Sequence, residues 1–244
     1  MIKIVVPSCG NTEFFKESYY PKTLCEVSGE PMLQLVVDNY KSLEEKRFVF
    51  LFLQEECNRF HTDNIARLLT DENCDIVRLK SITGGALCTC LMAVEYINTE
   101  DAIIITNNDQ IINTDLDKVI AFFEKKKSDC GVICFKSVHP RWTYIRAEEK
   151  RVLEAAEKRP ISKNAIAGFY YFRHGRDFIK AACRAIEKGA DYEGRYYLSA
   201  SINEMILMNK NVDIYPIEAV NYKSFYSPEK ISIYEKEMRT HEKS

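Results

Sequence analysis

A single carboxylate follows the most apolar short segment of the chain. Residues 102–105 form an uninterrupted apolar run, and the next residues are Thr106, Asn107, Asn108, Asp109 and Gln110. Such a run, bounded by turn-forming residues, is typical of a strand buried on both faces of a parallel sheet. Ligands of open α/β sheets bind beyond the carboxyl ends of their strands. Asp109 therefore stands where it could hold Mg²⁺ against phosphate oxygens; the alternative is a polar turn that only satisfies local backbone groups.

Two segments of small residues follow other predicted strands and could approach a phosphate. Residues 2–6 predict a first strand, which is followed by Pro7, Ser8, Cys9, Gly10, Asn11 and Thr12. Further along, Gly84 and Gly85 precede a helix that is predicted to start near Ala86. Backbone N–H groups at such loops and helix starts bind anions, and glycine lets a ligand come close. Each segment is equally compatible with an ordinary tight turn.

The elements around these segments alternate between strand and helix in the first half of the chain. Strands are predicted at 48–53, 75–79 and 131–135, and helices after Pro31, at 58–69, from Ala86 and at 115–127. This alternation is typical of a doubly wound, mostly parallel sheet. The later elements are a hairpin (143–146 and 152–157), a strand at 165–172 that contains Gly168, helices at 176–188 and 196–208, a strand at 212–215 and a terminal helix from Pro228.

Composition and charge exclude several classes of protein. The 244 residues carry a formal net charge of −2, which gives no electrostatic case for binding nucleic acid or an anionic membrane. No apolar run is long enough to span a bilayer, and the N-terminus starts with a strand-like segment rather than a signal peptide. The nine cysteines and four histidines lack the spacing of a zinc site. We therefore expect buried free thiols in a reduced, cytoplasmic protein.

The order of several motifs resembles the sugar nucleotidyltransferases. The resemblance rests on IVVPSCG and YYPKTLCEVSGEPML near the N-terminus, TGGALCTCLMAVEYI and DAIIITNNDQII in the middle, and AAEKRPISKNAIAGFYYF and NYKSFYSPEKISIYE towards the C-terminus. These motifs follow the order of the family over most of the chain. The resemblance implies one domain over residues 1–244, with a Rossmann-like, mostly parallel sheet sandwiched by helices. Residues 1–140 would bind the nucleotide, and residues 141–227 would form a small β-rich acceptor lobe.

The resemblance also implies roles for individual residues. The family transfers a nucleoside monophosphate from a nucleoside triphosphate to a phosphorylated acceptor, a reaction that depends on positioning and charge neutralisation. Lys22, Asp109 and Lys158 would be catalytic, and Asp109 would hold Mg²⁺. Glu157, Lys158 and Gly168 would bind the acceptor. The nucleotide would contact Pro7, Ser8, Cys9, Gly10, Gly84, Gly85, Ala86 and Asn108. The alternatives are a solvated Lys22 and an exposed Glu157–Lys158 pair in a charged hairpin.

The sequence departs from the family pattern in two segments. Thr12 and Phe14 stand where the first loop of the family has a second glycine and an activating arginine, and Glu13 adds a negative charge there. Ser224 stands where the family often has a second metal-binding aspartate. The loss of one charge-stabilising donor often costs about 10²–10³ in rate. Cations that could substitute are Lys16, Lys163 and Lys223. Without a substitute, the protein would be slow, specialised or catalytically inactive.

The compact length resembles the cytidylyltransferase branch, so CTP is the expected donor. The acceptors left open are a sugar 1-phosphate, phosphocholine, a phosphonate and an amide-linked phosphate such as phosphoglutamine. Bacterial capsule or surface-polysaccharide synthesis is the expected setting, by analogy with the family. A glycosyltransferase is a second hypothesis, although 107–109 offers one carboxylate where such enzymes usually carry Asp-x-Asp. A nucleotide-sensing domain without catalysis is the third.

Several polar and aromatic residues in the later half are assigned to packing. Arg141 with Trp142, residues 195–197 and residues 170–172 are expected to pack in preference to contacting a ligand. Asn203 and Glu204 are weaker candidates for a position facing the pocket. Apolar surfaces on the late helices could support a homodimer.

Overall fold

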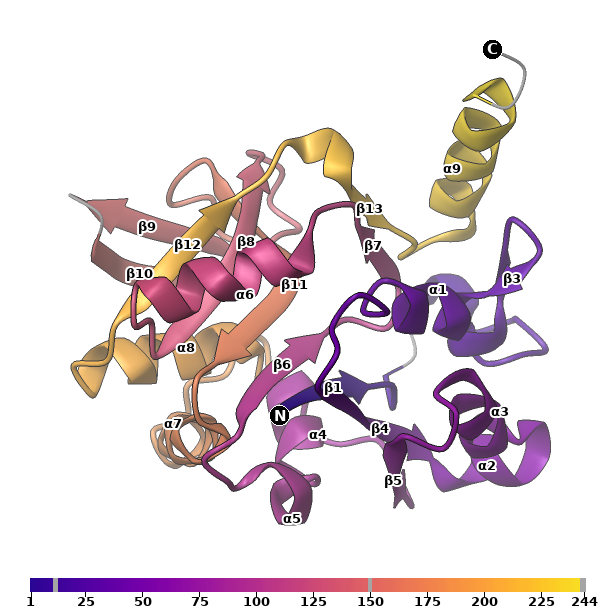
Figure 1. Cartoon of the computed structure of the whole chain (residues 1–244), viewed down its shortest axis with the longest axis horizontal. Coiled ribbons are helices and arrows are strands. Elements are labelled where there is room, and N and C mark those ends of the chain that lie inside the picture. The colour runs from indigo at the N-terminus through magenta and orange to yellow at the C-terminus, as the bar shows by residue number, and fades with distance from the viewer. Residues whose placement is uncertain (11–12, 149–150, 242–244) are drawn as a thin grey trace.

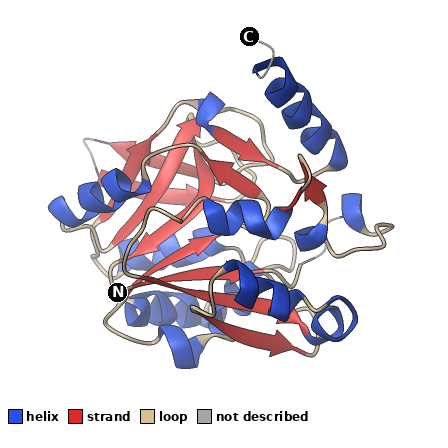
Figure 2. Ribbon diagram, turned by 45° about the vertical axis from the view of Figure 1, so that its right-hand side comes forward, coloured by secondary structure: helices blue, strands red, loops and turns tan. Residues whose placement is uncertain are grey.

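The computed structural model describes residues 1–10, 13–148 and 151–241. A nine-stranded sheet with helices on both faces forms its centre (Figures 1 and 2). The strands run in the order β10-β9-β11-β6-β1-β4-β5, while β8 pairs with β11 and β12 pairs with β8. The sheet therefore contains strands from both the first 140 residues and the later part of the chain.

The predicted parallel core of the sheet is confirmed. It consists of β1 (Ile2–Pro7), β4 (Lys46–Leu53), β5 (Cys74–Leu79) and β6 (Ala102–Thr106). The antiparallel strands are β11 (Asn164–Phe172), which pairs with β6 and β8 (Cys130–Lys136), and the hairpin β9 (Tyr144–Glu148) and β10 (Arg151–Ala156). The last strand, β12 (Val212–Pro216), is parallel to β8. The turn of the hairpin, at 149–150, lies outside the described residues.

Helices cover both faces because alternate residues of the central strands enter opposite cores. On one face Val5 and Ile105 pack with α4 (Ala86–Leu91), α5 (Val94–Ile97), α7 (Gly175–Glu187) and α8 (Leu198–Leu207). On the other face Ile4 and Ile104 pack with α1 (Met32–Asp38), α3 (Thr62–Leu69) and α6 (Leu116–Lys125). This arrangement holds the carboxyl ends of β1 and β6 rigidly side by side.

Two predicted helices are interrupted. The helix predicted at 58–69 consists of α2 (Gln54–Phe60) and α3, because His61 between them has a φ of 55°, a left-handed conformation that ends a helix. The helix predicted from Ala86 stops at Leu91 and resumes as α5. The terminal helix α9 (Pro228–His241) projects from the body of the molecule (Figures 1 and 2).

Short elements that have too few residues for a periodic pattern escape sequence-based prediction. They are the 3₁₀ turns η1 (Glu13–Phe15), η2 (Lys22–Leu24) and η3 (Ala219–Asn221), and the strands β2 (Glu26–Val27), β3 (Glu30–Pro31), β7 (Gln110–Ile112) and β13 (Tyr222–Ser224). The pairing of β13 with β7 brings the segment before α9 against the residues that follow β6.

Strand β11 changes partners at Gly168, and this change opens space at the end of β6. Residues 169–172 pair with β6, whereas Ala165 pairs with Tyr144 of β9 on the same edge of the strand. Gly168 lies between these pairings with a φ of 59°, and a Cβ atom there would stand 2.2 Å from Oε1 of Gln110. Its carbonyl oxygen accepts hydrogen bonds from Nε2 of Gln110 at 2.9 Å and from the backbone N–H of Asn107 at 3.1 Å.

Replacing Gly168 with alanine tests whether this position requires glycine. Gly168→Ala should lower the free energy of unfolding by about 2–5 kcal/mol, because it combines left-handed backbone strain with overpacking. Gly189 is the matched control, since it has a φ of 63° and open space, with nothing within 4 Å, where a Cβ atom would stand. Gly189→Ala should lower the free energy of unfolding only through backbone strain, by about 1–2 kcal/mol. Equal losses in urea denaturation of the two variants would show that the contact with Gln110 is unimportant.

Candidate active site

Two hollows meet beyond the carboxyl ends of β1 and β6. The first hollow, of about 390 Å³, lies between the loop after β1 and the start of α4. The sequence-predicted residues that line it are Pro7, Cys9, Gly10, Gly84, Gly85, Ala86 and Asn108. Ser8 does not line it; this residue is buried, and its hydroxyl donates to the carbonyl of Val6 at 3.5 Å. Asn11 and Thr12, which continue the predicted loop, lie outside the described residues.

The second hollow, of about 280 Å³, occupies the space where β6 and β9 diverge. Asp109, Glu157 and Gly168 line it, so residues from three distant segments surround one cavity. Ala86 and Tyr197 line both hollows, and the neighbouring residues Asn108 and Asp109 line the first and the second respectively. The two hollows therefore adjoin at the end of β6.

The glycine pair before α4 lets the backbone of Tyr196 come close, and the same pair lines the first hollow. Gly85 has a φ of 135°, and a Cβ atom there would stand 2.4 Å from the carbonyl oxygen of Tyr196. The backbone N–H of Tyr196 donates to the carbonyl of Gly84 at 2.9 Å, and that of Leu87 donates to the carbonyl of Tyr196 at 3.1 Å. These contacts fix the segment 194–197 at the rim of both hollows.

Lys22 and Asp109 form a buried ion pair. The Nζ atom of Lys22 donates to Oδ2 of Asp109 at 2.5 Å, and the two side chains are 8% and 11% exposed. Lys22 is therefore not the solvated lysine of the alternative interpretation. The backbone of Asp109 is held as well, since its carbonyl accepts from the N–H of Phe225 at 2.7 Å. This pair joins η2, the end of β6 and the segment before α9.

Glu157 is a half-buried residue whose carboxyl group lies at the wall of the second hollow. Burial raises its pKa, and the hydroxyl groups of Thr143 and Ser199 oppose this shift by donating to Oε2 at 2.6 and 3.2 Å. Glu157 is therefore not part of an exposed charged pair. Lys158 has a φ of 50°. Its Nζ atom lies over the rings of Tyr192 and Tyr197, 5.3 and 5.4 Å from their centres. Lys158 thus stands beside the second hollow rather than among its lining residues.

Arg195 is a site residue that sequence reasoning missed. The sequence pattern assigns it to packing, yet it lines the first hollow and is the one charged side chain among the described lining residues. The proposed substitutes do not line this hollow: Lys16 pairs with Glu13 at 2.6 Å, and Lys223 pairs with Glu237 at 2.7 Å. The Lys16 ammonium and, more weakly, the Arg195 guanidinium lower the pKa of the Glu13 carboxyl. Nothing in the local sequence marks Arg195, because its place depends on a loop folded against α4.

Arg141 and its aromatic neighbours were also missed as lining residues. Arg141 lines the second hollow, with its guanidinium 4.0 Å from the ring centre of Trp142 and 4.2 Å from that of Tyr226. Phe14, the residue in place of the family's arginine, contacts Tyr226 edge-on with ring centres 5.8 Å apart. Tyr170 lines the same hollow although it is buried.

Asn203 and Glu204 do not line either hollow. The side chain of Asn203 bonds to the backbone of Ala155 at 2.8 and 2.9 Å, and Glu204 pairs with Arg184 and Lys188. Both residues hold α8 in place, and they line a separate hollow of about 320 Å³ that shares Glu157 and Tyr197 with the second hollow.

The donor groups at the end of β6 suit one kind of metal site. Within the described residues, no three His, Cys, Asp or Glu side chains come together as a metal-binding cluster. Mg²⁺ commonly uses one or two protein carboxylates and completes its shell with water and substrate phosphate. Asp109, at the junction of the hollows, fits such a shared site. Cys9 is not a nucleophile there, because burial raises the pKa of its thiol to about 12.

Comparison with known proteins places this fold. The mixed sheet, with a parallel core and helices on both faces, defines an α/β protein with two adjoining hollows beyond β1 and β6. Residues 17–218 match the family model described as nucleotidyl transferase. The chain belongs to that family, which confirms the prediction from the motifs. No helix in the described part of the chain is long and apolar enough to cross a membrane.

Two solved structures share the fold. The nucleoside-diphosphate-sugar pyrophosphorylase from Vibrio cholerae RC9 has a TM-score of 0.81 and 20% identity, covering 96% of this chain and 99% of its own. A Bacillus anthracis protein described as a putative glucose-1-phosphate thymidylyltransferase, solved with sucrose, has a TM-score of 0.78 and 15% identity, covering 98% and 96%. The comparison with curated proteins found no match.

The buried pair of Lys22 and Asp109 generates a prediction about stability. Lys22→Met leaves an uncompensated buried carboxylate and should lower the free energy of unfolding by about 3–5 kcal/mol. The double variant Lys22→Met/Asp109→Asn should lose less than the sum of the single losses, with a coupling of about 0.5–3 kcal/mol in urea denaturation. Additive losses would mean that the two groups do not interact.

Glu56, in α2, is a half-buried residue near Cys9 of the first hollow. Burial, and to a lesser extent the charge of Glu55, raises its pKa to about 7. Its Oε2 atom has no hydrogen-bond partner, and its charge adds to the shift of Cys9. Because the folded-state pKa lies above the unfolded value, its contribution to stability is full below about pH 4.5 and is lost as the pH rises through 7.

The pH dependence of unfolding checks this assignment. The native protein should lose stability between about pH 5 and about pH 8, and Glu56→Gln should reduce that loss. Glu55→Gln, at the exposed neighbouring position, removes only the smaller cause of the raised pKa and should reduce the loss less than Glu56→Gln does. Urea denaturation at the two pH values measures both, and identical profiles for native protein and Glu56→Gln contradict the assignment.

Proposed function

We propose that this protein transfers a nucleoside monophosphate from a nucleoside triphosphate to a small phosphorylated acceptor and releases pyrophosphate, with Mg²⁺ as cofactor. CTP is the preferred donor in this proposal, and bacterial capsule or surface-polysaccharide synthesis is its setting. The acceptor is a sugar 1-phosphate or a non-sugar phosphate such as phosphoglutamine or phosphocholine. Membership of the nucleotidyl transferase family supports the reaction class; donor, acceptor and metal are proposals.

One observation carries the proposal: two hollows meet where Asn108 lines one and Asp109 lines the other. A transfer reaction needs two substrates whose reacting groups touch while their remaining parts lie apart. The nucleotide would occupy the first hollow, with its base near Gly84, Gly85 and Ala86. The acceptor would occupy the second hollow, beside Glu157 and Gly168. The α-phosphate of the donor would then lie at the junction.

In the proposed reaction an acceptor phosphate oxygen forms a bond to the α-phosphorus, and the bond from that phosphorus to the oxygen that bridges it to the β-phosphate breaks. Both reactants are anions, so stabilisation of charge and correct placement supply most of the catalysis. Arg195 and the backbone donors at Gly10 would bind the triphosphate. Asp109 would hold Mg²⁺, which neutralises phosphate charge when bound. Lys22 positions Asp109 through the buried ion pair and is close enough to the junction to contribute its charge.

The second hollow also indicates how an acceptor is oriented. Thr143 and Ser199 donate to Oε2 of Glu157, so Oε1 is the oxygen that would accept hydrogen bonds from acceptor hydroxyl or amino groups. The unpaired Nε atom of Arg141 offers a donor on the same wall. The side chain of Lys158 would approach the acceptor phosphate only by leaving the rings of Tyr192 and Tyr197.

A matrix of ATP, CTP, GTP, UTP and dTTP against phosphorylated acceptors, read by pyrophosphate release, tests the proposal. CTP with one acceptor should give the highest kcat/KM, and chelation of Mg²⁺ should abolish turnover. Arg195→Ala should lower kcat/KM by about 10–10³-fold through loss of a cation at the triphosphate. Arg67→Ala removes an exposed arginine paired with Glu72 and should change nothing. Asp109→Asn should abolish turnover, with folding checked by circular dichroism.

Other outcomes point elsewhere. Release of nucleoside diphosphate from nucleotide-sugars, without pyrophosphate, would favour the glycosyltransferase hypothesis. Mg²⁺-dependent nucleotide binding with no turnover for any acceptor would favour the sensing domain. Full activity of both Arg195→Ala and Asp109→Asn would disprove the site.

A further inference from the structure

A third hollow continues the second hollow away from the nucleotide side. It has a volume of about 500 Å³ and lies between the end of β8, the segment around β13 and α9. Its lining shares no residue with the first hollow. The residues that it shares with the second hollow are Arg141, Trp142, Tyr222, Ser224 and Tyr226. An acceptor in the second hollow therefore has room to extend past these residues.

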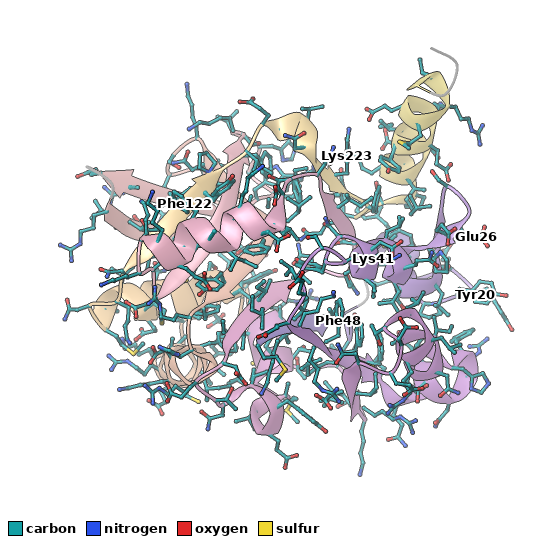
Figure 3. The ribbon with its side chains drawn as sticks, viewed as in Figure 1. Tyr20, Glu26, Lys41, Phe48, Phe122 and Lys223 are labelled. Carbon is teal, nitrogen blue, oxygen red and sulfur yellow. The ribbon has the colours of Figure 1, made fainter. Side chains whose placement is uncertain are left out.

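The third hollow is basic. Lys136, Lys223 and Lys230 line it together with Arg141, and Glu237 is the one acidic lining residue in the described part of the chain. Glu237 is already neutralised by Lys223, which lies on β13 (Figure 3) and pairs with it at 2.7 Å. Lys136 donates only to the neutral amide of Asn164, at 2.8 Å. The ammonium group of Lys230 has no hydrogen-bond or ion-pair partner among the described residues. The excess positive charge is thus not neutralised by any residue in the described part of the chain.

Arg141 stands at the boundary between the second and third hollows with an unused donor. Its guanidinium lies against the rings of Trp142 and Tyr226, and its buried Nε atom has no hydrogen-bond partner among the residues that the structure describes. No carboxylate among the described residues pairs with this group. A planar guanidinium held by aromatic rings is suited to bidentate binding of a carboxylate or phosphate. These rings already hold a cation, which disfavours a quaternary ammonium group at the same place.

On the basis of the proposed function, we propose that the acceptor carries a second acidic group, such as a carboxylate, at the end remote from its reacting phosphate. The phosphate lies in the second hollow near Asp109 and Arg141, and the second acidic group lies in the third hollow against Lys136 and Lys230. The enzyme thus selects phosphorylated acids, including phosphorylated amino acids and sugar acids, over neutral or cationic phosphates.

Matched acceptor pairs that differ by a carboxylate test this proposal. O-phosphoserine is compared with phosphoethanolamine, and glucuronic acid 1-phosphate with glucose 1-phosphate. Calorimetric affinity, which needs no turnover, and kcat/KM from pyrophosphate release are both measured. The acidic member of at least one pair should be preferred by about 10-fold or more, because charge-assisted hydrogen bonds to a carboxylate are strong.

The variant Lys136→Met/Lys230→Met should bring this preference close to one while leaving the neutral member unchanged. Lys136 is exposed and Lys230 is half-buried, so the fold should tolerate both substitutions. Lys125→Met/Lys180→Met removes two exposed lysines that line none of the three hollows, and it should keep the full preference.

The failure of this inference is distinguishable from failure of the proposed function. Equal affinity for both members of each pair, or equal losses for both members in Lys136→Met/Lys230→Met, overturns the assignment of the third hollow even if turnover is observed. Absence of pyrophosphate release with every acceptor contradicts the proposed function, whereas a calorimetric preference that disappears in the lysine variant still supports the acidic subsite.

Discussion

The buried ion pair of Lys22 and Asp109 is the interaction on which the candidate site depends. A carboxylate at the end of β6 with only 11% of its side chain exposed would be costly without a cation beside it, and Lys22 provides one at 2.5 Å. The pair also links segments that are 87 residues apart in the chain. A hydrophobic pair at this place would often give at least equal stability, so stability alone does not account for the two charges.

The geometry around this pair follows from a change of partner in one strand. Strand β11 pairs with β9 at Ala165, changes direction at Gly168 and then pairs with β6 from Phe169 onwards. The part of the sheet around β9 therefore diverges from the parallel core. The first hollow lies at the carboxyl end of the parallel core, and the second lies where β6 and β9 diverge. The two hollows are therefore formed by two parts of one continuous sheet, which fixes their relative position.

Positive charge is distributed unevenly over the three hollows. The first has Arg195 alone among its described lining residues, the second has Arg141 with two carboxyl groups, and the third has four basic side chains and one acidic one. In the proposed arrangement Mg²⁺ at Asp109 would neutralise part of the triphosphate charge, whereas an acidic group at the far end of the acceptor would have only protein cations to neutralise it. This contrast gives a physical reason for placing the nucleotide in the first hollow and an acidic acceptor end in the third.

The sequence by itself determined the parallel core, the family and most lining residues of the first hollow. Apolar runs such as 102–105 are strands whatever surrounds them, and Asp109 and the glycines near α4 follow directly from those strands. Only the tertiary structure decided that Arg195 and Arg141 line the hollows, that Lys158 stands aside and that Glu204 is bound elsewhere. The reason is physical: local patterns record burial and backbone preference, whereas the direction of a long charged side chain depends on which distant segment packs against it.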